Sequence, residues 1–340
     1  MRTAFMETLR HVAEQDPRVY LVVGDLGFGV VEPFARALPD QFLNVGVAEQ
    51  NMTGVAAGLA LCGKVVFTYS IANFPTLRCV EQIRNDVCYH GANVKVVAVG
   101  GGFAYGALGM THHATEDLAI LRALPGMTVV APGDPRETEA AVRAAVAQDG
   151  PFYLRLGRAG EPRVHTRPID FQIGRAIPVR DGSDVTLIST GGMLHTAVTA
   201  AATLADLGIE ARVLSMHTLK PLDCDAVVRA ADETGAIVTV EEHSVLGGLG
   251  GAVAETLAEA DGPRVPFRRL GLPSVFTREV GSQDFLRARC GLSPEGVVET
   301  VVPLVRRGRG ERRSGGVLSD GARRGELSRG QAAGYPAEGA

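Results

Sequence analysis

The sequence predicts an α/β protein made of two consecutive open parallel-sheet domains, each with three layers. Short apolar runs, typical of buried strands, alternate with longer segments of helical periodicity along most of the chain. The 340 residues, 46% of them hydrophobic, are sufficient for two cores. Residues 161–175 combine helix breakers with little periodicity and predict a linker between domains at 1–160 and 176–305.

The composition excludes several classes of protein. A formal net charge of −4 with 21% charged residues excludes a wholly disordered chain and a nucleic-acid binder that relies on bulk positive charge. No apolar run approaches the roughly 20 residues of a membrane helix, and the acidic N-terminal segment does not resemble a secretory signal. Five cysteines without a C-x-x-C pair indicate reduced thiols and a cytoplasmic location.

The first domain is expected to begin with a buried strand that ends at a glycine. Its strands are predicted at 18–23, 93–99, 127–131 and 151–156, and its helices at 49–61, 77–90 and 135–148. Within the second of these helices, Val80, Ile83 and Val87 share one face. The helix at 49–61 is rich in glycine and alanine, which predicts close packing against a neighbour.

The same alternation resumes after the linker. Strands are expected at 184–189, 211–215 and 236–240, with helices at 194–207 and from Gly250 onward. Residues 306–340 contain nine glycines and eight arginines but few large apolar side chains, so a disordered tail is predicted. The tail is interpreted as a solvated extension, with anchoring to an acidic partner as the alternative.

Residues just after strands are the first candidates for a site, because open α/β sheets bind ligands at the carboxyl ends of their strands. Asp25 and Leu26 follow the first strand in a G-x-x-G-x-G segment. A dinucleotide fingerprint would place a third glycine where Glu32 stands, so a dinucleotide site is rejected.

Glu49 opens a helix directly after a short strand. An acid in the first turn interacts favourably with the helix dipole, which needs no ligand. A buried carboxylate at such a strand-to-helix junction can also contact a ligand. Both interpretations remain open on the residues alone.

Several segments, taken together and in order, resemble the transketolase family of thiamine diphosphate enzymes. VGVAEQNMTGVAAGLA resembles the family's pyrimidine-binding domain, as do FTYSIANFPTLRCVEQIRND, GMTHHATEDLAILRALPGM and PFYLRLGR. VLSMHTLKPLD and VEEHSVLGGLGGAVAE resemble its C-terminal domain. The resemblance spans residues 2–305 and implies a pyrimidine-type domain followed by a transketolase C-terminal-like domain.

The resemblance implies roles for the residues after the first three strands. Glu49 would hydrogen-bond N1′ of the aminopyrimidine and act as a catalytic residue. Phe74 would stack on that ring, with Ile71 at a neighbouring position that is often aromatic in the family. Asp25 and Leu26 would line the cofactor pocket, Leu26 supporting the bent cofactor.

Substrate residues are implied further along the chain. His112 would reach into the substrate channel as a second catalytic residue, beside His113, and Arg158 would bind a substrate phosphate. The family's acidic segment before this histidine is replaced by Gly106–Gly109, where Leu108 stands in place of an aspartate. Whether the substrates are phosphorylated therefore stays open.

The family's magnesium-binding G-D-G motif is not found in this sequence. The resemblance therefore implies the carboxyl-terminal half of a split enzyme, with thiamine diphosphate and Mg²⁺ held mainly by a separately encoded diphosphate-binding subunit. No metal ligand is expected in this chain. Self-association through both domains would give a heterotetramer.

The activity expected on this basis is transfer of a two-carbon ketol unit from a ketose donor to an aldehyde acceptor. One alternative keeps the cofactor, as the beta subunit of a 2-oxoacid dehydrogenase or as a decarboxylating ketol synthase. Another is a non-catalytic regulatory or scaffold subunit. A lysine-dependent aldolase would have to use Lys64, Lys95 or Lys220, none of which lies in an evident pocket motif.

Overall fold

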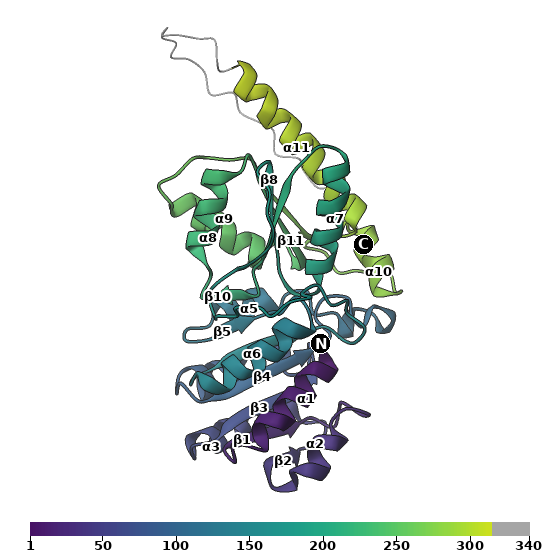
Figure 1. Cartoon of the computed structure of the whole chain (residues 1–340). Helices are drawn as coiled ribbons and strands as arrows, with labels where there is room; N and C mark the ends of the chain where they lie inside the picture. The colour runs from purple at the N-terminus through teal and green to yellow at the C-terminus, as the bar shows by residue number, and fades with distance from the viewer. Residues whose placement is uncertain (315–340) are drawn as a thin grey trace, which may run out of the picture.

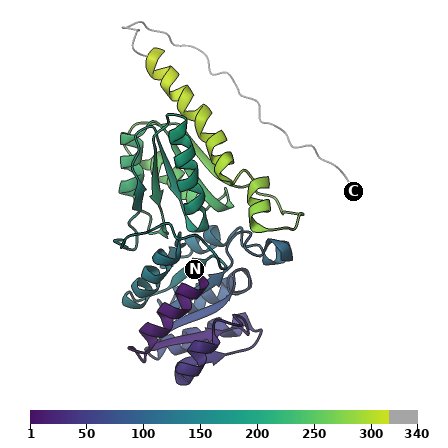
Figure 2. The same ribbon diagram turned by 45° about the vertical axis from the view of Figure 1, so that its right-hand side comes forward.

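The structure, a computed structural model, describes residues 1–314 as two α/β domains stacked end to end (Figure 1). The N-terminal domain contains α1 and α3, and the second domain carries α7, α8 and α9. The long helix α11 (Pro294–Ser314) runs along the second domain and projects beyond it, as the turned view shows (Figure 2).

The first sheet has seven strands in the order β10-β5-β6-β4-β3-β1-β2. Every neighbouring pair is parallel except β10 with β5. The strands are β1 (Val19–Val23), β2 (Phe42–Asn44), β3 (Val65–Ile71), β4 (Val94–Val99), β5 (Thr128–Val130), β6 (Phe152–Leu156) and β10 (Thr218–Lys220). All residues of β4 and β6 are buried, as expected for parallel strands covered on both faces.

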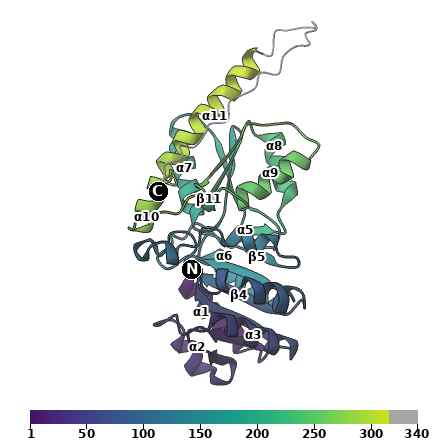
Figure 3. The same cartoon turned by 180° about the vertical axis from the view of Figure 1, so that it is seen from behind.

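Helices cover both faces of this sheet. They are α1 (Arg2–Ala13), α2 (Glu32–Ala37), α3 (Glu49–Leu61), α4 (Val80–Gln82), α5 (Asp117–Ala123) and α6 (Pro135–Ala147). Val97 packs in the same cluster as Phe5 of α1, whereas Val96 packs in the cluster that contains Met52 of α3. Adjacent residues of β4 therefore reach different helical layers. Figure 3 shows α1, α3 and α6 of this domain from behind.

The second sheet has five strands in the order β12-β11-β8-β9-β7, with only β7 antiparallel to its neighbour. Its strands are β7 (Ile177–Arg180), β8 (Val185–Ser189), β9 (Ala211–Ser215), β11 (Ile237–Ser244) and β12 (Phe267–Leu272). The accompanying helices are α7 (Leu194–Asp206), α8 (Cys224–Glu233), α9 (Leu249–Glu259), α10 (Gln283–Arg289) and α11. The predicted fold class is confirmed, with one antiparallel strand added to each sheet.

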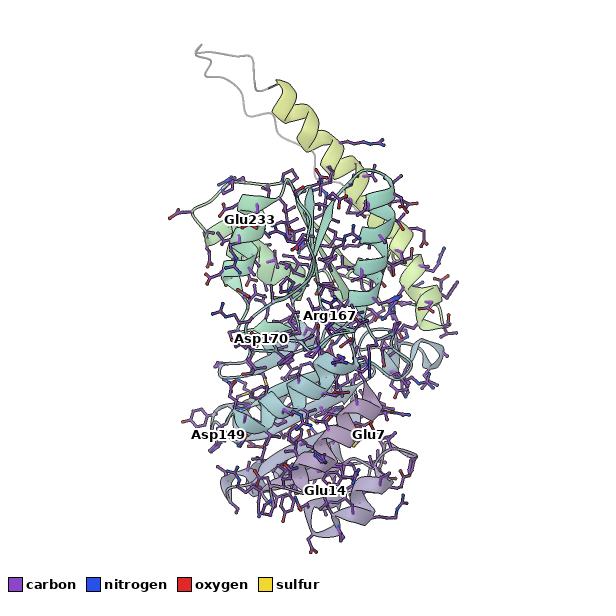
Figure 4. The ribbon with its side chains drawn as sticks, viewed as in Figure 1. Glu7, Glu14, Asp149, Arg167, Asp170 and Glu233 are labelled. Carbon is purple, nitrogen blue, oxygen red and sulfur yellow. The ribbon has the colours of Figure 1, made fainter. Side chains whose placement is uncertain are left out.

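The linker segment is held in place although it forms no helix or strand. The buried His165 Nε2 lies 2.7 Å from Glu137 Oε1, and Asp134 Oδ2 accepts hydrogen bonds from the N–H groups of Val164 and His165. Arg167 and Asp170 of the same segment lie between the two domains (Figure 4). The two domains are further joined by β10, which leaves the second half of the chain to pair with β5.

Two segments differ from the expected elements. Residues 77–90 form a 3-10 turn (Leu77–Cys79), the short α4 and a π-helix (Ile83–Cys88) rather than one α-helix. The interrupted helix still buries Ile83 and Val87 completely, so core packing prevails over regular geometry. Helix α11 extends to Ser314, into the expected disordered tail, and Val301 and Leu304 pack its earlier turns against the core. Residues 315–340 of that tail lie outside the described residues.

Among residues 1–314, no helix combines the length and apolar character needed to cross a bilayer.

Candidate active site

The predicted site residues all lie at or beyond the carboxyl ends of strands in the first sheet. They are Asp25 and Leu26 after β1, Glu49 after β2, Ile71 and Phe74 at the end of β3, His112 and His113 after β4, and Arg158 after β6. Because these parallel strands end at the same edge, residues far apart in sequence converge there.

Glu49 is the first residue of α3 and only 1% of it is exposed. Its Oε2 lies 2.9 Å from Nη1 of Arg78, whereas its buried Oε1 accepts no hydrogen bond from any residue that the structure describes. A Cβ on Gly24 would lie 3.4 Å from Glu49 Cγ, so the end of β1 packs directly against this side chain. One carboxylate oxygen is therefore paired and the other is available to a donor.

Arg78 is a site residue that the sequence analysis did not identify. Its guanidinium carbon lies 4.8 Å from the centre of the Phe74 ring, so Arg78 contacts both the carboxylate and the aromatic residue. The only signal in the sequence is a spacing of four residues from Phe74. Its contact with Glu49 spans 29 residues and depends on the tertiary fold.

Aromatic and basic side chains form a continuous row away from Arg78. The ring centres of Phe74 and His112 lie 5.2 Å apart, and those of His112 and Tyr105 lie 6.5 Å apart. The guanidinium carbon of the exposed Arg158 lies 5.3 Å from the centre of Tyr105. The structure thus brings the predicted residues Phe74, His112 and Arg158 together, with Tyr105 as the residue that joins them.

A second arginine, Arg2 of α1, acts on Tyr105 through its charge. Nε of Arg2 is buried without a hydrogen-bond partner within the described part of the chain. Burial raises the pKa of the Tyr105 phenol, and the positive charges of Arg2 and Arg158 oppose that rise. Arg2 is therefore a second site residue that the sequence analysis missed.

His113 differs in environment from its neighbour His112. It is 4% exposed, and its ring centre lies 5.0 Å from that of Phe103. Burial lowers the pKa of the His113 imidazole, so this ring is neutral near pH 7. Its main-chain oxygen accepts a hydrogen bond from the Asn73 amide, and its Nε2 has no partner among residues 1–314.

A cavity of about 320 Å³ opens beside these residues. Phe74, Arg78 and His113 line it from the first domain. Val275 and Phe276 line it from the second domain and are largely exposed. Both domains thus contribute to the space next to the Glu49–Arg78 pair.

Asp25 adopts a left-handed backbone conformation, with φ of 54°. Asn44 fixes this turn, because its Oδ1 accepts from the Asp25 N–H at 3.1 Å and its Nδ2 donates to Asp25 Oδ1 at 3.0 Å. Leu26 and Ile71 are partly exposed at the ends of β1 and β3. These residues form the rim of the site rather than its buried part.

The outward face of α3 is open in this chain. Gly54 and Gly58 are exposed, and a Cβ on either would meet no atom within 4 Å in the described chain. The close packing predicted for this glycine face is therefore absent within residues 1–314. The alanines at 56, 57 and 60 form the buried face instead. Val47 and Phe28 are 73% and 72% exposed.

None of the three lysines lies among these site residues. Lys95 is the second residue of β4 and lies at the opposite ends of the strands, where its Nζ donates to the carbonyls of Gln148 and Gly150 and burial lowers its pKa to about 7. Lys220 donates to carbonyls near the end of α5, and Lys64 lies over Tyr20. Within the described chain no group of three or more His, Cys, Asp or Glu could hold a metal ion.

Comparison with known proteins gives the same architecture. Residues 1–161 match the transketolase pyrimidine-binding domain, and residues 174–297 match the transketolase C-terminal domain. The chain belongs to the transketolase family.

Two similar proteins are single subunits of about the same length. The chain is 42% identical over 308 residues to a subunit of the apulose-4-phosphate transketolase of Phocaeicola vulgatus, covering 90% of this chain and 97% of that protein. It is 41% identical over 308 residues to a 6-deoxy-6-sulfo-D-fructose transketolase subunit of a Clostridium species, covering 90% of this chain and 95% of that protein. A solved structure of a split gene transketolase, an inactive beta4 tetramer, matches this chain with a TM-score of 0.81 and 40% sequence identity. The match covers 90% of this chain and 97% of the chain in that structure. The chain is a subunit of a split transketolase-like enzyme.

Proposed function

We propose that this chain supplies the pyrimidine-binding half of the active site of a split transketolase that transfers a two-carbon ketol unit from a ketose to an aldehyde. The observation that carries this proposal is the buried Glu49 carboxylate, whose Oε1 has no partner within the described chain. An unsatisfied buried acceptor is costly unless a ligand donates to it. The aminopyrimidine of thiamine diphosphate carries such a donor when N1′ is protonated.

The residues around Glu49 suit that cofactor. Glu49 would hold a proton at N1′, while Phe74 and Ile71 would flank the aminopyrimidine ring. Leu26 and Asp25 would line the edge of the pocket. Thiamine diphosphate, when bound, supplies an electron sink for cleavage of the bond next to the donor carbonyl. The chain's own task is to orient the ring and to hold the proton at N1′.

The row from His112 to Arg158 suits the substrates. His112 would hydrogen-bond a substrate hydroxyl near the reacting carbon. Arg158, which lies over the Tyr105 ring, and Arg2, whose charge acts on the same phenol, would bind an anionic group at the far end of the substrate. The buried, neutral His113 would fix the loop that carries His112.

The open face of α3 suits a partner protein. Two exposed glycines on one helical face allow another backbone to approach closely, and Val47 and Phe28, outside this helix, are exposed apolar residues of the same domain. We propose that a separately encoded subunit docks there, contributes the diphosphate and Mg²⁺ site, and assembles with this chain as a heterotetramer. The five free cysteines suit the reducing cytoplasm as its compartment.

The test combines the full-length chain with the separately encoded subunit in the presence of thiamine diphosphate and Mg²⁺. We expect ketol transfer from ketose donors only when both proteins are present. Measuring product formation alongside carbon dioxide release from pyruvate separates the alternatives. Pyruvate turnover without ketol transfer would instead identify the chain as a subunit of a 2-oxoacid dehydrogenase or of a decarboxylating ketol synthase. No turnover with any donor would favour a scaffold role.

Replacing Arg78 separates its effect on Glu49 from general damage to the site. In the reconstituted enzyme we expect Arg78→Met to weaken thiamine diphosphate binding by about tenfold, because the buried carboxylate loses its paired charge. Arg78→Lys should recover part of the affinity. Isothermal titration with the cofactor measures both variants.

Arg84→Met is the matched control, since Arg84 is an exposed arginine of the neighbouring π-helix. It should bind the cofactor like the parent protein. Equal losses in Arg78→Met and Arg84→Met would show that the Glu49–Arg78 contact does not matter for the cofactor.

A further inference from the structure

A second cavity, of about 480 Å³, lies between the two domains and is separate from the one beside Glu49. Its lining includes Gly191, Gly192 and Glu242 from the second domain. Gly101 and Arg155 line it from the first domain. No residue lines both cavities.

The cavity lies at the topological switch point of the second sheet. From β8 the chain moves to β9 on one side, and it later returns to β11 on the other side of β8. Open α/β sheets bind ligands outside the carboxyl ends of the two strands that flank such a point. Gly191 and Gly192 follow β8, and Glu242 lies near the end of β11, so both flanking strands reach this cavity.

The segment after β8 exposes the start of a helix. Gly191 and Gly192 form a 3-10 turn that leads into the 13-residue α7, and no side chain caps α7. The first N–H groups of a helix lack partners within it and attract negative charge. A Cβ on Gly192 would lie 3.1 Å from Nη2 of Arg287, so a guanidinium stands beside the helix start.

A buried arginine provides the second, independent observation. The Arg155 side chain is 6% exposed, and its Nε and Nη2 donate to Asp117 and to main-chain carbonyls. Its Nη1 has no hydrogen-bond partner within residues 1–314. If Gly191 carried a side chain, its Cβ would lie 3.9 Å from this Nη1. Nε of Arg287 is likewise buried without a partner in this part of the chain. The unused polar groups around the glycines are donors.

Two of the three carboxylates that line the cavity are already engaged. Glu242 accepts hydrogen bonds from the Phe103 N–H at 2.9 Å, from the Gln283 amide and from Arg287 Nη2 at 2.6 Å. Glu161 pairs with the N-terminal ammonium group at 2.7 Å. The third, Asp284, is 95% exposed, and its Oδ1 lies 4.0 Å from Nη1 of Arg287. The site therefore offers free donors to a ligand rich in acceptor oxygens.

We propose that this interdomain cavity binds the phosphate group of a small phosphorylated metabolite. The turn at Gly192, which leads into α7, and the guanidinium groups of Arg155 and Arg287 hold the phosphate, and the remaining volume holds the rest of the molecule. This site is distinct from the cofactor site and does not rest on the proposed ketol transfer.

The test titrates the full-length chain with inorganic phosphate, and separately with ribose 5-phosphate, by isothermal calorimetry. Gly192→Asp places a carboxylate beside Arg287, where it repels the ligand without removing any arginine. Gly192→Ala is its matched control. Arg287→Gln removes a donor, and Arg289→Gln, at an exposed position of α10, is the control for it. Arg158→Gln removes the anion contact expected at the other site.

We expect Gly192→Asp and Arg287→Gln to raise the phosphate Kd by about tenfold or more, with Gly192→Ala and Arg289→Gln close to the parent protein. Ribose 5-phosphate should bind at least as tightly as inorganic phosphate. The proposal fails if the parent chain binds neither probe, or if Gly192→Asp binds them as the parent does. It also fails if only Arg158→Gln loses binding. Binding of inorganic phosphate alone would overturn the assignment to a metabolite.

Discussion

Glu49→Gln is expected to lower kcat/KM for ketol transfer by about 10²–10⁴-fold in the reconstituted enzyme. The amide keeps the shape of the side chain but can no longer exchange a proton with the cofactor ring. Glu49 is 1% exposed, so no water can easily take over that role. Steady-state kinetics with saturating thiamine diphosphate and Mg²⁺ measure the loss.

Glu81→Gln is the matched control, because Glu81 is an exposed glutamate of the short helix α4. It should retain parental kinetics. Melting temperatures of both variants distinguish a catalytic loss from unfolding. If Glu49→Gln turns over ketose at the parental rate, Glu49 has no catalytic part in this enzyme.

Asp117→Ala is expected to have the largest effect on stability. Asp117 accepts hydrogen bonds from Arg155 at 2.7 Å and from the Tyr153 hydroxyl, and both partners are buried. Removing the carboxylate leaves an unpaired buried guanidinium and should cost about 3–5 kcal/mol of unfolding free energy. Urea unfolding of the full-length chain measures this change.

The pH dependence follows from the same pair. Burial raises the pKa of Asp117, but the charges of Arg155 and His243 outweigh this, so the folded-state pKa lies below the ordinary value of 3.8. The stability from this depressed pKa is therefore present above about pH 4 and is lost as the pH falls through the folded-state pKa. In Asp117→Ala this part of the acid sensitivity should disappear.

The control for Asp117→Ala is Asp16→Ala. Asp16 pairs with Arg18 at 2.8 Å, but the Arg18 side chain is 62% exposed, so the loss should be about 0–1 kcal/mol. Similar losses in the two variants would show that burial does not distinguish the two ion pairs.

Much of the fold could be predicted because hydrophobic pattern and helix boundaries are local. The helix expected at 49–61 has those bounds in α3, and the strand expected at 93–99 differs from β4 only in starting one residue earlier. The three-residue β10 could not be predicted, because it lacks an apolar run and pairs with β5 only through the tertiary fold. The π-helix after α4 was missed since its buried residues fit an α-helical spacing equally well.

The candidate site could be predicted only in part from the sequence. The roles of Glu49, Phe74 and His112 followed from the family resemblance rather than from spacing, and those roles stay predictions. Arg78 and Arg2 were missed because their contacts join segments far apart in sequence. The buried Asp117–Arg155 pair, 38 residues apart, was missed for the same reason.

The most direct test of the central claim is the exchange of the cofactor's thiazolium C2 proton with deuterium, followed by NMR in the reconstituted enzyme. This exchange precedes any substrate and depends on how the aminopyrimidine ring is held and protonated. With Glu49 holding the N1′ proton, Glu49→Gln should slow the exchange by about 10²-fold or more while Glu81→Gln leaves it unchanged. Equal exchange rates in the parent enzyme and Glu49→Gln would contradict the role given to Glu49.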